Sequence, residues 1–353
     1  MPRKRQWAAA LIAVCTAGAM LAAPARADTA DTIVDLPVQF TVRNENRTPV
    51  RCQADGKTYT IRGHLTAPAS ALRDDGAVTL YFHGIAEGEW YWRLGVPGYD
   101  HSREMAERGH ASVTIDRLGY DSSDKPNGFD SCIGAQGDIA HQIVQQLRRG
   151  SYKATGRDDA PRFERVAVAG HSNGGQVAQI AAYTFGDVDG VVLMGWTDLG
   201  LTQQAMQRFL TSSQKCAQGG EPAERGGDPP GYVHYDVGEA EFVLGNFHDT
   251  DRRVIDAAVP LQNRHPCGDM GSQISGLFAD GTRLDEIKAP VLLVYGAEDS
   301  RVQGGAAHAG RLTAAESVEV LNVPDAGHFM NVERNAPMVH DRLAAWLNRH
   351  ELG

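Results

Sequence analysis

The fold of this chain is decided by residues 166–175, which read VAVAGHSNGG. The apolar run Val166–Ala169 predicts a buried strand, and the following stretch Gln176–Phe185 is compatible with a helix. Between such a strand and helix the chain turns so sharply that the positions beside Ser172 admit only small residues, and the turn lifts the serine hydroxyl clear of the sheet. The pattern predicts that Ser172 is a nucleophile. A glycine-rich turn with an incidental serine would explain the glycines but nothing further along the chain.

Two later segments supply the acid and the histidine that a serine nucleophile requires, in that order. Asp299 follows the apolar run Val291–Tyr295, and His328 follows the apolar run Val318–Val323. Each residue is expected where a loop leaves the carboxyl end of a strand, which is the edge at which parallel sheets bind ligands. We therefore predict that His328 takes the Ser172 proton as general base, and that Asp299 orients the imidazole and stabilises its charged form.

The loop from Phe82 to Ala86 follows another apolar run and completes the predicted site. An acyl-transfer reaction needs two backbone N–H donors for the oxyanion, one from the residue after the nucleophile and one from an earlier loop. We predict that these donors belong to Asn173 and Ile85. A backbone donor leaves no side-chain signature, so Gly84 and Ala86 stay alternatives to Ile85.

Short apolar runs bounded by glycine or proline alternate with helical stretches from Val78 onward. This alternation predicts an α/β fold with a mostly parallel sheet covered by helices. Two earlier segments, Val38–Arg43 and Tyr59–His64, alternate apolar and polar residues as an antiparallel pair would. The apolar runs are Val78–Phe82, Ala111–Ile115, Val166–Ala169, Val188–Met194, Val291–Tyr295 and Val318–Val323.

The alternation stops between about Asp198 and Arg283. A structureless loop of this length is improbable inside a compact domain, so we predict an inserted cap or lid. The expected organisation is a signal peptide at 1–27, a core at 28–197, the cap at 198–283 and the rest of the core at 284–353.

These segments together resemble the α/β-hydrolase superfamily. The resemblance implies the α/β-hydrolase fold, with helices on both faces of a mostly parallel sheet and an inserted cap. It also implies a Ser-His-Asp hydrolase that cleaves a carboxylic ester or a lactone through an acyl-enzyme. Relatives that open epoxides or displace halide use an aspartate nucleophile, so Ser172 disfavours those reactions. The motifs that carry the resemblance, which runs from about Val38 to Leu347, are Phe82-His83-Gly84, Asp116–Ser123, Gly170–Gly175, Gly296–Asp299 and Gly327-His328.

Several other residues compete for roles in this site. Asp198 lies where some members of the superfamily supply the acid, and Glu298 adjoins Asp299, but the Gly-x-x-Asp spacing favours Asp299. Four aromatic residues near the predicted site could line an apolar substrate pocket, although some could be ordinary core residues, Trp196 above all. They are Trp90, Tyr91, Trp196 and Phe329.

Two other functions are open. An exported aminopeptidase or amidase of similar fold would hold the substrate ammonium with carboxylates, for which the predicted cap offers Asp236, Glu239 and Glu241. These three could equally form a solvated acidic face, which we favour. A non-catalytic binding protein on this scaffold would be recognised by a lost nucleophile, acid or histidine, and all three residues are present.

Composition and charge restrict the partners. The chain has 353 residues, of which 42% are hydrophobic and 22% charged, so it is a folded protein with a sizeable core. A net charge of -10 argues against a broad nucleic-acid surface, which needs clustered Lys and Arg, and favours a small-molecule ester substrate. No C-x-x-C or H-x-x-x-H spacing occurs, so no metal or cofactor is expected. Nothing in the sequence indicates an oligomeric state.

The first 27 residues predict export. They hold four basic residues and no acidic ones, then an apolar run, then an A-x-A site that ends at Ala27. The run is short for a spanning helix, so cleavage and release to the periplasm or medium are expected, without stable membrane insertion. Loss of Cys15 with this segment leaves four cysteines, which predict two disulfides in an oxidising compartment. Three pairings are possible, of which we favour Cys52 with Cys132 and Cys216 with Cys267.

Overall fold

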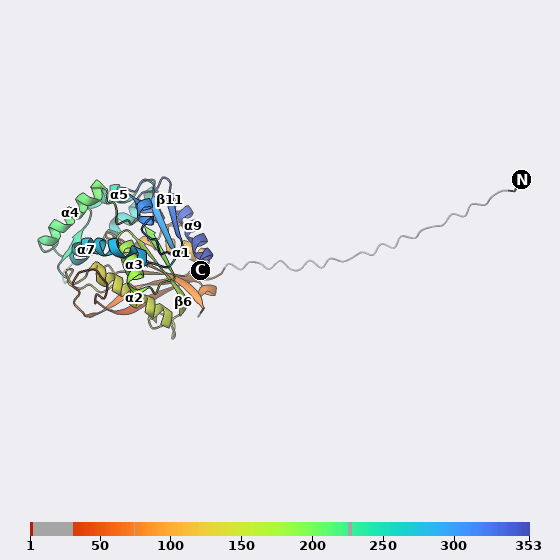
Figure 1. Cartoon of the computed structure of the whole chain (residues 1–353), viewed down its shortest axis with the longest axis horizontal. Helices are drawn as coiled ribbons and strands as arrows, with labels where there is room; N and C mark the ends of the chain where they lie inside the picture. The colour runs from red at the N-terminus through yellow and green to blue at the C-terminus, as the bar shows by residue number, and fades with distance from the viewer. Residues whose placement is uncertain (3–30, 74, 225–227) are drawn as a thin grey trace. The chain divides into compact units, whose positions relative to one another are not determined.

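The computed structural model of this chain describes residues 1–2, 31–73, 75–224 and 228–353. Residues Thr32–Gly353 form one compact unit. Its main sheet has nine strands within the described residues, in the order β11-β10-β7-β6-β3-β4-β2-β1-β5 (Figure 1). The strands are β1 (Ile33–Arg43), β2 (Thr58–Pro68), β3 (Gly76–Phe82), β4 (Ser112–Asp116), β5 (Lys153–Ala154), β6 (Phe163–His171), β7 (Gly190–Met194), β10 (Val291–Gly296) and β11 (Val318–Val323).

Six neighbouring strands of the sheet are parallel, from β11 to β4. β2 pairs antiparallel with β4 and with β1, and the pairing of β1 with β2 is the one that the alternating segments predicted. The short β5 pairs with β1 at the edge of the sheet. Because parallel strands point the same way, the loops after β3, β6, β10 and β11 leave from one edge. The loop predicted to hold the oxyanion, Phe82–Ala86, which we call the oxyanion loop, follows β3. Ser172 follows β6, Asp299 follows β10 and His328 follows β11.

Alternate side chains of the strands point to opposite faces of the sheet. Both faces are apolar, and helices cover both. Val166 and Val168 of β6 join the apolar cluster that contains α2 and α3 residues, whereas Ala167 and Ala169 join the cluster that contains α1 and α9 residues. The central part of β6, Val166–Ala169, is therefore apolar at every position, as strands buried on both faces are. The covering helices are α1 (His101–Glu107), α2 (Ile133–Arg149), α3 (Asn173–Phe185), α8 (Gly305–Ala309) and α9 (Ala336–Arg349).

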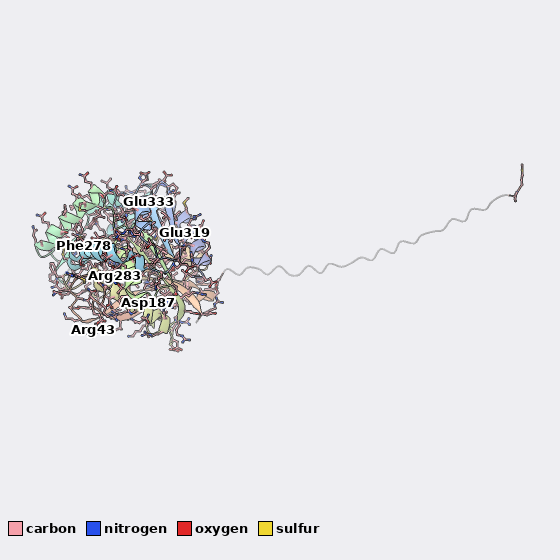
Figure 2. The ribbon with its side chains drawn as sticks, in the orientation of Figure 1. Arg43, Asp187, Phe278, Arg283, Glu319 and Glu333 are labelled. Carbon is pink, nitrogen blue, oxygen red and sulfur yellow. A yellow bond between two sulfur atoms is a disulfide. The ribbon has the colours of Figure 1, made fainter. Side chains whose placement is uncertain are left out.

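The segment that interrupts the alternation lies between β7 and β10, which pair with each other. It contains a two-stranded antiparallel sheet and four helices within its described part. One of these helices, α7, is amphipathic: Met270 is buried, while Phe278 is 77% exposed (Figure 2). The elements are α4 (Gln203–Ala217), β8 (Tyr232–His234), α5 (Gly238–Asn246), α6 (Arg252–Ala258), β9 (Arg264–Pro266) and α7 (Cys267–Arg283). We call this segment, residues 198–283, the cap; its exact boundaries stay a prediction.

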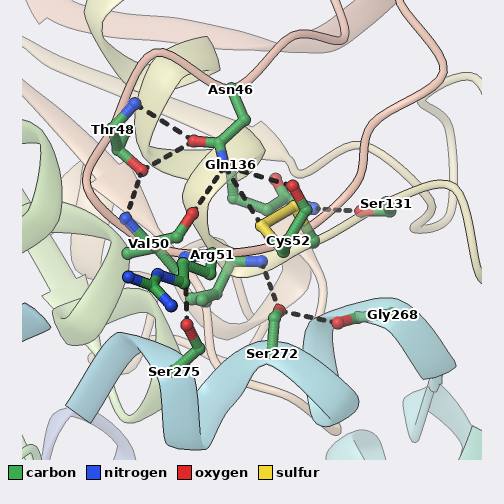
Figure 3. The surroundings of a disulfide bond; sticks show 12 residues. Asn46, Thr48, Val50, Arg51, Cys52, Ser131, Gln136, Gly268, Ser272 and Ser275 are labelled. Carbon is green, nitrogen blue, oxygen red and sulfur yellow. Dashed lines mark hydrogen bonds between the residues drawn. A yellow bond between two sulfur atoms is a disulfide. The ribbon is translucent and has the colours of Figure 1, made fainter. Parts of the chain in front are cut away.

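Both favoured disulfides are present. Cys216–Cys267 joins α4 to the start of α7 within the cap. Cys52–Cys132 joins the loop after β1 to the start of α2. Around this second bond, two hydroxyls of α7 accept backbone N–H groups of the core: Ser275 Oγ lies 2.9 Å from Arg51 N and Ser272 Oγ 2.9 Å from Ile133 N (Figure 3). One end of the cap is thus anchored beside a crosslink of the core.

The fold predicted from the sequence is confirmed. Each apolar run became a strand of the sheet, with ends that differ by a few residues. No described helix is long and apolar enough to cross a membrane. The predicted signal peptide and its cleavage site lie outside the described residues, apart from the first two residues.

Candidate active site

Ser172 occupies the turn between β6 and α3. Its φ of 51° and ψ of −127° are values that a non-glycine residue adopts only when the surroundings enforce them. The turn is held by the Ser172 N–H, which donates to Met194 O at 2.8 Å, and by the Gly175 N–H, which donates to Ser172 O at 2.8 Å. A Cβ on Gly174 would lie 2.3 Å from Phe82 O, so only glycine lets this turn press against the end of β3.

Asp299 and His328 form a buried pair at the same sheet edge. His328 Nδ1 lies 2.8 Å from Asp299 Oδ2, and both side chains are at most 3% exposed. The other carboxylate oxygen, Oδ1, accepts the N–H groups of Arg301 and Val302 at 2.7 and 3.1 Å. These bonds hold the Asp299 carboxylate in place, which directs the His328 Nδ1 proton to it and leaves Nε2 as the basic nitrogen.

Ser172 and His328 line one cavity of about 40 Å³. Within the described residues, no hydrogen bond joins the Ser172 hydroxyl to the His328 ring. Hydroxyl–imidazole distances are often long without substrate and shorten when it binds. Burial lowers the pKa of the His328 imidazole below its ordinary value, although Asp299 opposes this shift. The neutral ring, which is the form that can accept a proton, is therefore favoured.

Two backbone N–H groups are placed for the predicted oxyanion role. Asn173 is the first residue of α3, where helix N–H groups have no intrahelical acceptor, and Ile85 lines the cavity. Among the described residues, neither N–H donates to a backbone or side-chain acceptor. The Gly84 N–H is not available, because it donates to Glu87 Oε2 at 2.6 Å. This contact favours Ile85 over Gly84.

A second carboxylate–imidazole pair lies directly behind His328, and sequence reasoning missed it. Glu87 Oε1 is 2.7 Å from His171 Nδ1, and His171 Nε2 is 2.9 Å from the backbone oxygen of His328. The two imidazole rings are 4.6 Å apart between centroids. A Cβ on Gly84 would lie 2.3 Å from Glu87 Oε1 and 2.9 Å from Ser172 Cβ, so glycine is needed where the loop, Glu87 and Ser172 meet.

The aromatic residues need a correction. Of the four predicted pocket residues, Trp196 alone is among the residues described as lining the cavity. Tyr91 and Phe329 are fully buried and pack with each other at 4.9 Å between ring centroids, and Trp90 lies 6.2 Å from Phe329. Tyr91 also stacks on His171 at 4.4 Å. Tyr91 and Phe329 thus pack against the two histidine rings in the core, and Trp90 packs against Tyr91 and Phe329.

The competing acids lie elsewhere. Asp198 Oδ1 accepts hydrogen bonds from Gln179 Nε2 and Trp196 Nε1, both at 2.9 Å, and burial raises the pKa of its carboxyl to about 6. Glu298 is exposed. Asp299 is therefore the candidate acid that the structure places beside His328.

The three cap carboxylates do not share one environment, which corrects the expectation of a solvated acidic face. Glu239 is exposed, and Glu241 forms an ion pair with Arg208. Asp236, by contrast, is buried and lines the cavity with Ser172 and His328. Burial raises the pKa of the Asp236 carboxyl, and the Arg301 guanidinium opposes that rise.

No group of three or more His, Cys, Asp and Glu residues that could hold a metal ion occurs in the part of the chain that the structure describes.

A mostly parallel sheet between two helical layers, with a serine on a strand–turn–helix and a histidine–carboxylate pair at the same edge, defines a class of α/β enzymes with a nucleophile turn. The family model of the alpha/beta hydrolase family matches residues 80–341, and the chain belongs to that family.

Known proteins of this fold are similar to the chain. The AB hydrolase superfamily protein YfhM of Bacillus subtilis is 29% identical over 136 residues, which cover 38% of this chain and 39% of that protein. A thermophilic esterase from Thermogutta terrifontis superposes with a TM-score of 0.58 at 16% identity, over 88% of this chain and 99% of the esterase. A monoacylglycerol lipase of Paleococcus ferrophilus gives a TM-score of 0.58 at 16% identity, over 79% and 96% of the two chains. At these identities the solved structures show the shared fold alone.

Proposed function

We propose that this protein is an exported serine hydrolase that cleaves a carboxylic ester or lactone through an acyl-enzyme on Ser172. The observation that carries the proposal is the 2.8 Å contact between His328 Nδ1 and Asp299 Oδ2, on a histidine that lines one cavity with Ser172. Similarity to proteins described as esterases and lipases supports the reaction class.

In the first half of the reaction, His328 Nε2 takes the Ser172 proton while Oγ attacks the ester carbonyl. The carbonyl oxygen becomes an oxyanion, which the N–H groups of Ile85 and Asn173 stabilise. Asp299 stabilises the imidazolium. Collapse of the tetrahedral intermediate breaks the bond to the alcohol, which leaves with the proton of His328.

In the second half, His328 takes a proton from water, and the hydroxide formed attacks the acyl-enzyme carbonyl. The same two N–H groups stabilise the second oxyanion. Breakage of the bond to Oγ returns the proton to Ser172 and releases the acid. His328 accepts and then returns the proton in both halves of the reaction.

An ester substrate is favoured over the ammonium-bearing substrate of an aminopeptidase. Such an enzyme needs uncompensated carboxylates at its cavity. Asp236 is paired with Arg301, and Glu87 is engaged by His171 and the Gly84 N–H. Export is supported by the two disulfides, which persist in oxidising compartments.

The test compares Ser172→Ala with a control at an exposed serine, Ser151→Ala. Hydrolysis of p-nitrophenyl butyrate should fall by about 10⁴-fold or more in Ser172→Ala, as for other triad nucleophiles, and stay at the wild-type rate in the control. Peptide p-nitroanilides with free amines should be cleaved far more slowly than the ester. Undiminished ester hydrolysis by Ser172→Ala would rule the proposal out.

A further inference from the structure

One buried carboxylate oxygen in the cavity has no role in the reaction described above. Asp236 lies between β8 and α5 of the cap, and its side chain is 1% exposed. It lines the cavity that contains Ser172 and His328. Asp236 therefore forms part of the wall of the cavity in which a substrate carbonyl would lie.

The two oxygens of Asp236 differ. Oδ1 accepts a hydrogen bond from Arg301 Nη2 at 2.6 Å. Oδ2 is buried and has no hydrogen-bond partner among the described residues. Buried polar atoms are almost always hydrogen-bonded, and an unsatisfied one destabilises the fold, so Oδ2 is an acceptor that a substrate group or a water can satisfy.

Arg301 restricts what that partner can be. Its guanidinium is 5% exposed, pairs with Asp236 and lies 5.3 Å from the centre of the Tyr235 ring. The pair is electrically neutral as a unit. A cationic ligand on Oδ2 would lie close to the guanidinium, and an anionic ligand would meet the carboxylate. A neutral hydrogen-bond donor meets neither penalty.

The cavity is also small. Its space of about 40 Å³ takes a small group beside the reacting carbonyl, and the cavity is partly open to solvent, so the rest of a substrate can extend outward. A hydroxyl on a short chain suits this space better than the N–H of a peptide. We propose that Asp236 Oδ2 accepts a hydrogen bond from a hydroxyl group of the substrate. The preferred substrates are then hydroxylated short esters, or the corresponding lactones. This inference rests on the proposed function and names the substrate class of that site.

The experiment uses substrate pairs in which a hydroxyl replaces a methyl group of similar size. The acyl pair is p-nitrophenyl 3-hydroxybutyrate and p-nitrophenyl 3-methylbutyrate; the alcohol pair is 2-hydroxyethyl butyrate and propyl butyrate. In at least one pair the wild-type protein should prefer the hydroxylated ester by about 10- to 100-fold in kcat/KM, as expected for a hydrogen bond to a charged group. The pair that shows the preference identifies the side of the ester bond that meets Asp236.

Asp236→Asn tests the residue itself, because an amide keeps an oxygen for Arg301 and replaces the free acceptor with a donor. The preference for the hydroxyl should fall to about threefold or less, since the main acceptor is gone. Glu239→Gln removes a charge from the exposed surface of the same cap and should keep the wild-type preference. Circular dichroism and thermal unfolding show whether Asp236→Asn is folded.

The inference is overturned if neither pair shows a hydroxyl preference in the wild-type protein, a result that needs no variant and would leave water as the partner of Oδ2. It is also overturned if folded Asp236→Asn keeps the preference. Both outcomes differ from failure of the proposed function, in which the Ser172→Ala protein would hydrolyse all four esters at the wild-type rate.

Discussion

Two buried carboxylate–imidazole pairs stand one behind the other in this site, and they differ in what the second ring nitrogen faces. In the pair Asp299–His328, Nδ1 is bonded at 2.8 Å and the ring lines the cavity with Ser172. In the pair Glu87–His171, Nδ1 is bonded at 2.7 Å, and Nε2 is 2.9 Å from the His328 carbonyl oxygen. A carbonyl only accepts, so His171 Nε2 must donate.

In the proposed mechanism, the two carboxylate–imidazole pairs serve different purposes. His328 has a nitrogen left for proton transfer, whereas both nitrogens of His171 are used in binding. Glu87 also accepts the Gly84 N–H at 2.6 Å, so the Glu87–His171 pair, which we call the inner pair, connects the loop Phe82–Ala86 to the backbone of His328. We therefore expect the Asp299–His328 pair, the outer pair, to take part in proton transfer, and the Glu87–His171 pair, the inner pair, to hold His328 and the loop Phe82–Ala86 in position.

The largest difference is expected between the two histidines. His328→Gln should lower kcat on p-nitrophenyl butyrate by about 10⁴- to 10⁶-fold, because the general base is lost. His171→Gln should lower it by roughly 100-fold or less but reduce the free energy of unfolding by about 1–3 kcal/mol, because buried hydrogen bonds are broken. Steady-state kinetics and thermal unfolding measure the two effects. Equal losses of kcat in both variants would contradict the division of roles.

Substitution of Asp299 should lower kcat more than substitution of Glu87, as for the two histidines. Asp299→Asn favours the wrong tautomer of His328 and should lower kcat by about 10⁴-fold. Glu87→Gln keeps an acceptor for the Gly84 N–H and a donor for His171, so its effect should be at least tenfold smaller. Glu87→Ala, which keeps neither, should be worse than Glu87→Gln in both kcat and melting temperature. A Glu87→Gln enzyme as slow as Asp299→Asn would show that Glu87 takes part in proton transfer.

The pH dependence sharpens the assignment of the base. The active form of His328 is neutral, and burial lowers the pKa of this group below its ordinary value of 6.5. We therefore expect kcat/KM to stay level from pH 8 to about 6.5 and to fall about tenfold per pH unit below the His328 pKa. A profile that is already falling between pH 8 and 7, or that is flat down to pH 4, would contradict this assignment.

A third kind of histidine provides a smaller effect. The rings of His265 and His340 are buried without hydrogen-bond partners in the described residues, and burial lowers the pKa of each to about 3. Below pH 6.5 the unfolded chain binds protons at these positions and the folded chain does not. Each should then reduce the free energy of unfolding by about 1.4 kcal/mol per pH unit between about pH 6.5 and 3. Urea unfolding of His340→Gln should show a weaker acid dependence than the wild-type protein.

Much of this architecture was predictable because it is written in local patterns. The strands before Ser172, Asp299 and His328 contain apolar runs, interrupted by Glu319 and Asn322 in the last of them. The alternation of these strands with helices predicts parallel pairing, which places their carboxyl ends at one edge. The prediction that Asp299 is the acid required no knowledge of how the cap folds. Four cysteines allow three ways of forming two disulfides, and the favoured one, Cys52–Cys132 with Cys216–Cys267, is present.

The inner pair and Asp236 could not be predicted in the same way. Glu87 and His171 are 84 residues apart and meet only because the oxyanion loop packs against the serine turn. Asp236 is 65 residues from Arg301, and its sequence neighbours Glu239 and Glu241 are not buried. A charged residue looks like a surface residue until its distant partner is known. Of the four aromatic residues, Trp196 lines the cavity, whereas Tyr91 and Phe329 pack in the core, and only tertiary packing decides between these two outcomes.

The central claim, that Ser172 is a nucleophile activated by His328, is tested most directly by covalent labelling. The mature protein is treated with a fluorophosphonate, and its intact mass and peptide map are recorded by mass spectrometry. We predict a single adduct on the peptide that carries Ser172, with the rate of labelling reduced by at least about 10³-fold in His328→Gln. An unlabelled wild-type protein, or an adduct on another residue, would contradict the claim.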